Sequence, residues 1–154
     1  MRHIQTPVKR SKEFEETLQK LGGPGSKLFP TLREALTFCA TLGYKERRKK
    51  PLKSSMGTED IAGAQYMSNE AVDMLFALAL ADAKDSDILR PDREVECVKI
   101  YEEYANGGLE MVQEWIDRYA NIDVENAVWK GLQSIVDIPS MNDNASDEIR
   151  LPTF

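Results

Sequence analysis

The apolar residues of this chain recur every three or four positions from Ser11 to about Val136, and no segment shows the alternation typical of a strand. A repeat close to 3.6 residues places apolar side chains on one face of an α-helix. The chain has 154 residues, of which 42% are hydrophobic and 30% charged, which is enough for one core. The pattern therefore predicts an all-α fold, a compact single-domain bundle of about five to six helices.

Capping residues set the expected helix boundaries. The strongest signal is the capping box formed by Thr31 and Glu34, and Gly43 is the expected left-handed end of that helix. The adjacent glycines Gly107 and Gly108 are expected to break or bend the chain, because glycine is unfavourable inside a helix. Five expected helices follow Ser11 (to about 21), Thr31 (32–42), Ser68 (to about 82), Gly108 (to about 119) and Asp123 (to about 136). A sixth begins at Pro91 itself (91–105). The helix after Ser68 is apolar around nearly its whole circumference, so it is expected at the centre of the core.

Three parts of the chain are distinguished by composition. Residues 1–10 are expected to be a flexible N-terminus, residues 11–136 a single helical domain, and residues 137–154 an acidic, disordered tail. Residues 44–57 are rich in Lys and Arg and poor in apolar side chains, which predicts an exposed basic loop. No secretory leader or membrane-spanning segment is recognised, and a reducing cytoplasmic location is expected.

Residues suited to catalysis or metal binding are scarce. His3 is the only histidine, and it lies in the terminus that is expected to be mobile. Cys39 and Cys97 are far apart in sequence and each falls within an apolar helical stripe, so both are expected to be buried structural thiols. Carboxylates that could hold a hard metal ion are expected to be solvated surface groups: Asp82, Asp85, Asp87, Glu102 and Glu103. We therefore expect no catalytic residues, no metal site and no cofactor.

Charge is distributed unevenly along the chain. The net charge is −6, but residues 1–53 carry +8 and residues 54–154 carry −14. The densest positive charge follows the helix that begins at Thr31, and arginine and lysine side chains bind phosphates or acidic protein surfaces. The candidate binding residues are Lys45, Arg47, Arg48, Lys49, Lys50 and Lys53. An ordinary solvated loop is the alternative interpretation.

Two stretches resemble a known family. They are LFPTLREALTFCATLGYKERRKKPL over residues 28–52 and YEEYANGGLEMV over residues 101–112. Together with the apolar helix between them they resemble Dnd system-associated protein 4, and the resemblance covers residues 28–118. The second stretch, with Glu103-Tyr104-Ala105-Asn106-Gly107-Gly108-Leu109, is the more specific. The resemblance implies a setting, which is bacterial DNA phosphorothioation with its modification and restriction systems, and it implies no catalytic residue.

These observations lead to one functional hypothesis and two alternatives. We expect a non-catalytic accessory or regulatory subunit that contacts larger proteins of a phosphorothioation modification or restriction system. The first alternative is a DNA-binding module that uses the basic loop 45–53, although the acidic remainder of the chain would repel DNA. The second is a carboxylate-based hydrolase or nuclease.

Overall fold

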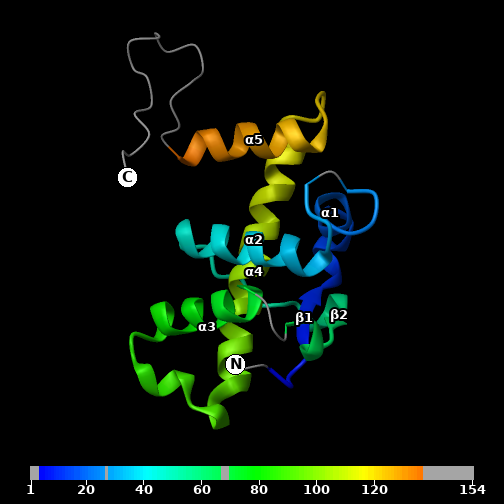
Figure 1. Cartoon of the computed structure of the whole chain (residues 1–154). Helices are drawn as coiled ribbons and strands as arrows, with labels where there is room; N and C mark the ends of the chain where they lie inside the picture. The colour runs from blue at the N-terminus through cyan, green and yellow to red at the C-terminus, as the bar shows by residue number, and fades with distance from the viewer. Residues whose placement is uncertain (1–3, 27, 67–69, 137–154) are drawn as a thin grey trace, which may run out of the picture.

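The computed structural model describes residues 4–26, 28–66 and 70–136. Within these residues the α-helices are α1 (Glu15–Leu21), α2 (Leu32–Lys45), α3 (Glu70–Ala83), α4 (Glu94–Arg118) and α5 (Val124–Ile135). Helix α4 runs along the length of the molecule, and α2, α3 and α5 lie against it at successive levels (Figure 1). The predicted all-α class is confirmed, with the addition of one small sheet.

Several predicted helix starts are confirmed. The Thr31 hydroxyl accepts a hydrogen bond of 3.1 Å from the backbone N–H of Glu34. The Asp123 carboxylate accepts one of 2.9 Å from the backbone N–H of Asn126. Pro91 occupies the first turn of a short 3₁₀ segment, Pro91–Arg93, that leads into α4, as its fixed φ and missing N–H favour. Ser68 and the tail 137–154 lie outside the described residues.

The expected interruption at Gly107 and Gly108 is wrong, because α4 continues through both residues without a break. Neither glycine has a positive φ. Their role is to let other backbone segments approach. A β-carbon at Gly107 would collide with the carbonyl of Arg48, and one at Gly108 with the carbonyl of Cys39. Helix α4 therefore contains two glycines in its interior because the absence of side chains there lets α2, and the segment that follows α2, pack closely against it.

Gly43 is also not the helix end that the sequence predicts. It is buried inside α2, and a β-carbon there would collide with the carbonyl of Tyr104 in α4. The helix ends two residues later, and the left-handed residue is Arg47, with φ of 54°. The N–H groups of Arg47 and Arg48 donate to the carbonyls of Tyr44 and Gly43, at 3.1 and 2.8 Å. This pair of bonds is a Schellman motif, in which glycine is the usual left-handed residue.

A two-stranded antiparallel sheet was not expected from the sequence. Strand β1 (Val8–Ser11) pairs with β2 (Thr58–Ile61), with Val8 opposite Ile61. Residues 4–10 thus differ from the flexible N-terminus that we expected, because Ile4 and Val8 are buried in the core. Strands of only four residues are too short for alternation to be recognised. A pair of strands this short is not stable by itself, and here β1 also packs against α4.

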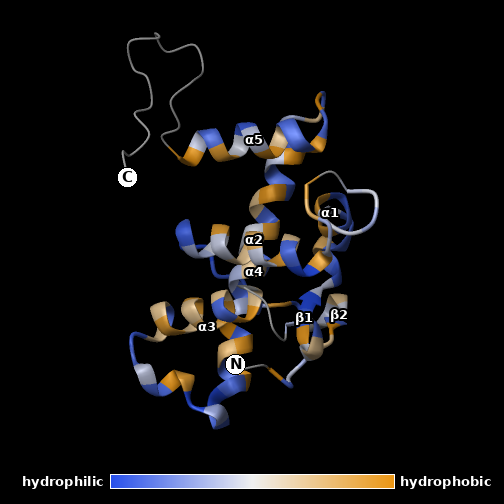
Figure 2. Cartoon of the chain, viewed as in Figure 1, coloured by the Kyte–Doolittle hydropathy of each residue, from blue (hydrophilic) through white to orange (hydrophobic). Residues whose placement is uncertain are grey.

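The central helix is α4 and not α3, which corrects the prediction from hydropathy. Figure 2 shows α3 as strongly hydrophobic, yet one of its faces is exposed. Met74 and Leu80 are 38% and 39% exposed, whereas Leu75 and Ala79 are fully buried. Among the described residues, no helix is long and apolar enough to cross a membrane. The apolar pattern of α3 thus reflects a core face plus a second face on which Met74, Ala77 and Leu80 are exposed together with Asp73.

Candidate interaction site at the basic segment

The basic segment, Lys45–Lys53, is bound along α4 by its backbone. The side-chain amide of Asn106 donates to the carbonyls of Lys50 and Pro51, at 3.2 and 3.3 Å. The backbone N–H of Lys50 donates to the carbonyl of Glu103 at 3.0 Å. Asn106 is only 2% exposed, so these bonds satisfy the buried N–H groups of its side-chain amide, while its side-chain oxygen has no partner among the described residues. The basic segment therefore has a defined path on the surface rather than the freedom of a solvated loop.

The two sequence motifs that resemble a family lie against each other here. Tyr104, Asn106 and Gly107 of the second motif contact the end of α2 and the basic segment of the first. Gly108 of the second motif meets the carbonyl of Cys39 in the first. The packing of residues 39–51 on α4 therefore brings the second half of the first motif against the second motif.

Four of the six candidate side chains form ion pairs with acids on other elements. Arg48 pairs with Glu114 at 2.9 Å and with Glu110 at 3.5 Å. The remaining pairs are Lys50 with Glu110 (2.5 Å), Lys49 with Asp82 (3.1 Å) and Lys53 with Glu13 (3.3 Å). The prediction from sequence placed these cations in one exposed loop but did not identify their partners.

The other two candidates, Lys45 and Arg47, have no ion-pair partner on a distant element among the described residues. Lys45 is 3.9 Å from the carboxylate of the adjacent residue, Glu46. Arg47 is exposed, and no ion pair joins it to any described residue. Among the six candidates, these two side chains are the ones that no ion pair joins to a described residue on another element.

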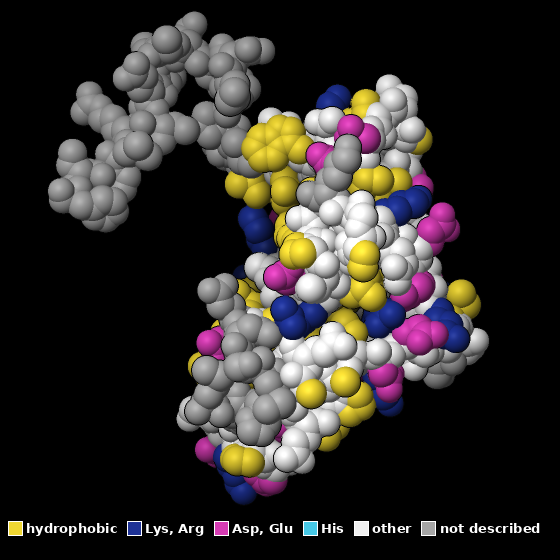
Figure 3. Space-filling view, turned by 45° about the vertical axis from the view of Figure 1, so that its right-hand side comes forward, with side chains coloured by type: hydrophobic (Ala, Val, Ile, Leu, Met, Phe, Trp, Pro, Cys, Tyr) yellow, Lys and Arg dark blue, Asp and Glu magenta, His cyan; other side chains and the backbone are white. Residues whose placement is uncertain are grey.

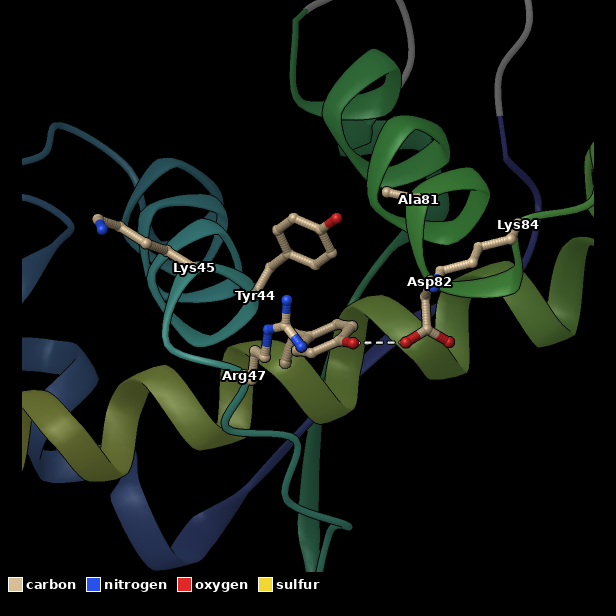
Figure 4. Close-up of a pocket in the computed structure, with 7 residues that line it drawn as sticks. Tyr44, Lys45, Arg47, Ala81, Asp82 and Lys84 are labelled. Atoms are coloured by element: carbon tan, nitrogen blue, oxygen red, sulfur yellow. Dashed lines mark hydrogen bonds between the residues drawn. The ribbon is translucent and has the colours of Figure 1, made fainter.

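A pocket of about 420 Å³ opens beside them, where the ends of α2 and α3 meet the middle of α4. Its lining residues are Tyr44, Lys45, Arg47, Ala81, Asp82, Lys84 and Tyr104. In Figure 4 the Arg47 side chain rises toward the ring of Tyr44, Lys84 extends toward Asp82, and Lys45 points away. The dashed line marks the short hydrogen bond that the Tyr104 hydroxyl donates to Asp82. The pocket thus combines cations, two tyrosines and one carboxylate.

The carboxylate in this pocket is neutralised within the protein. Burial alone would raise the pKa of Asp82, but hydrogen bonds from Tyr104 and Lys49 outweigh it, and the pKa lies below its usual value. Burial and the Asp82 carboxylate together raise the pKa of Tyr104 to about 12. At neutral pH the pair is therefore an ionised Asp82 bound by a protonated Tyr104 and by Lys49. The expectation that Asp82 is a solvated surface acid is wrong, because it is half-buried and paired.

A second carboxylate with an altered pKa, Glu102, lies on α4 and faces the sheet. Burial raises the pKa of Glu102 to about 7, although the backbone N–H of Lys9 donates to it at 2.5 Å. Among the described residues, no three His, Cys, Asp or Glu side chains are arranged to hold a metal ion. His3 lies outside the described residues.

Sequence reasoning missed Tyr104, Glu110 and Glu114 as parts of this site. The spacing of the two glutamates, four residues apart, does place them on one helix face and was an available signal. Their distance from the basic segment in sequence, 62 and 66 residues from Arg48, concealed the pairing. On the face that Figure 3 shows, Lys and Arg side chains are likewise interspersed with Asp and Glu.

The fold and this surface define a small helical protein whose basic segment is ion-paired to its own acidic helices. The family model for DNA sulphur modification system-associated protein 4 matches residues 7–146, and the chain belongs to this family. No curated protein and no solved structure matches the chain.

Proposed function

We propose that this protein is a non-catalytic accessory subunit of a DNA sulphur modification system and that it acts by contacting larger proteins of that system. Membership in a family named for association with such a system supports the setting. The single observation that carries the mode of action is the exposed apolar face of α3. Met74 and Leu80 lie on it, and residues of this kind are typical of protein interfaces.

The partner for this face is a protein that presents apolar side chains with acidic residues beside them. The face of α3 ends at the pocket, where Lys84 follows the helix and Lys45 and Arg47 lie nearby. Positive charge at one end of this face favours a partner of opposite charge and increases its rate of association. The arrangement therefore supports binding to an acidic protein surface.

Duplex DNA is the alternative ligand, and the ion pairs of the basic segment weigh against it. Phosphates could reach Arg48, Lys49 and Lys50 only by displacing carboxylates that already hold them. Such an exchange releases few counterions, which are the main source of affinity for a DNA backbone. Acidic side chains on α4 would also remain close to the phosphates and repel them.

The test is copurification with the proteins of the same DNA sulphur modification system. Met74→Glu and Leu80→Glu should each abolish recovery of a system protein while leaving the melting temperature within a few degrees. Met56→Glu is the matched control, because Met56 is 50% exposed but lies outside α3. Recovery that is equal for all three variants, or salt-sensitive binding of duplex DNA without any protein partner, would overturn the proposal.

A further inference from the structure

The pocket at the ends of α2 and α3 has a second unusual property. Among the described residues other than glycine, Arg47 and Lys84 alone have a positive φ, of 54° and 56°. Both line this pocket, and neither forms an ion pair with a described residue. A left-handed conformation is unfavourable for a side chain of this kind, and glycine would adopt it without strain. The chain thus places a free cation at both strained positions around one pocket.

The charge balance of the pocket favours an anion. The C-terminal end of a helix carries about half a negative charge, so the C-terminal ends of α2 and α3 together offset about one of the two free cations. Asp82 is already compensated by Lys49 and by the hydroxyl of Tyr104. About one positive charge therefore remains for a ligand, and Arg47 has the planar fork that suits phosphate oxygens.

The aromatic residues indicate what the anion carries. Tyr44 and Tyr104 form an edge-to-face pair with ring centroids 5.5 Å apart, and 38% of Tyr44 remains exposed. An exposed tyrosine ring next to an arginine is a platform on which a nucleobase stacks. The volume of about 420 Å³ falls within the range of pockets that hold small ligands.

We infer that this pocket binds a nucleoside monophosphate, with its phosphate held by Arg47 and Lys84 and its base against Tyr44. The same group occurs as a free nucleotide and as the 5′-phosphorylated end of a DNA strand, and both present the same chemistry to the pocket. The inference goes beyond the proposed function. It shares the cations Arg47 and Lys84 with the end of the exposed α3 face, but it uses neither Met74 nor Leu80.

The test is titration of the full chain with AMP and dAMP, followed by calorimetry and by tyrosine chemical shifts. Saturable binding is expected, and Arg47→Gln or Lys84→Gln should weaken it about tenfold, the usual consequence of losing one hydrogen bond to a charged group. Lys130→Gln is the matched control, because Lys130 also lies over a tyrosine ring, that of Tyr119, at 5.5 Å. Tyr44→Leu should weaken AMP binding without changing binding of inorganic phosphate.

Two further arms separate the sources of the ligand. A single-stranded oligonucleotide with a 5′-phosphate that binds more tightly than its 5′-hydroxyl counterpart supports a strand end, and preference for the free nucleotide supports a soluble ligand. Absence of saturable binding by every probe would overturn the inference. Equal affinity for AMP and inorganic phosphate, or equal loss in Lys130→Gln, would do the same.

Discussion

Gly108 of α4 lies directly against the backbone carbonyl of Cys39 in α2, so closely that a β-carbon at position 108 would collide with it. Gly43 of α2 has the same relationship with the carbonyl of Tyr104 in α4. The two helices therefore approach through glycine from both sides, and this contact is the most extensive between any two elements described. It positions the end of α2, and with it the basic segment.

Replacing Gly108 by alanine should destabilise the protein by about 2 to 3 kcal/mol. The added methyl group meets backbone atoms, which cannot rotate away, and this cost exceeds the gain in helix propensity of about 1 kcal/mol. Gly25→Ala is the control, because nothing lies within 4 Å of its β-carbon position and only its φ of 87° opposes the change. Urea denaturation should show the smaller loss, about 1 kcal/mol, for that control. Equal losses would contradict the steric explanation.

These glycines show what the sequence could and could not predict. Apolar periodicity and capping residues depend on near neighbours in the chain, so α2, α5 and the start of α4 were predicted well. A glycine that makes room for another segment looks the same in sequence as one that ends a helix. The sequence therefore predicts a helix end at Gly43 and a break at Gly107, although their neighbours are the distant residues Tyr104 and Arg48.

The candidate site was predicted in part for the same reason. The cations of residues 45–53 are obvious in the sequence, and most of them are exposed as expected. Their ion-pair partners are 33 to 66 residues away, and the backbone of the basic segment is bound by a buried asparagine in the middle of a helix. Only the packing of α2 on α4 brings these groups together.

The ion pairs predict unequal contributions of the basic residues to stability. Arg48→Gln should lower the free energy of unfolding by about 1 kcal/mol or less, because Arg48 is 35% exposed and pairs with two glutamates. Lys53→Gln should have almost no effect, since its side chain is 55% exposed and has one partner at 3.3 Å. A double-mutant cycle of Arg48→Gln with Glu114→Gln, measured at low and high salt, tests the assignment. A coupling energy of zero at low salt would refute it.

Glu102 should make stability depend on pH. Its folded-state pKa of about 7 is above its ordinary value of 4.5, chiefly because of burial, with Asp60 and Glu103 adding to the shift. The folded state therefore holds a proton that the unfolded state releases between these values. This contribution is fully present below about pH 4.5 and is lost as the pH rises through about 7.

The variant Glu102→Gln isolates this effect. It should reduce the loss of melting temperature between pH 5 and pH 8, and it should be more stable than the parent at pH 8. Glu103→Gln, one residue along the same helix, is the control and should retain most of the parental slope, because burial, and not the charge of Glu103, is the main cause of the raised pKa of Glu102. A parental slope in Glu102→Gln would show that Glu102 ionises normally.

Both cysteines should react slowly with thiol reagents in the native protein. Cys39 and Cys97 are fully buried, and burial raises the pKa of the Cys39 thiol far above its usual value. The Cys97 thiol also donates to the carbonyl of Ile88 at 3.1 Å. Labelling should therefore occur at the rate of unfolding, and two thiols should react at once in denaturant. Rapid labelling of either cysteine without denaturant would contradict the predicted burial.

Arg47 and Gly43 allow the helix end to be tested by opposite substitutions. Arg47→Gly should raise the free energy of unfolding by about 0.5 to 1 kcal/mol, because glycine adopts a φ of 54° without strain. Gly43→Ala should lower it by about 2 kcal/mol or more, because the new methyl group meets the carbonyl of Tyr104. If Gly43 were the left-handed residue that ends the helix, Arg47→Gly would instead destabilise the protein. Thermal denaturation of the two variants beside the parent distinguishes these cases by the sign of the change at Arg47.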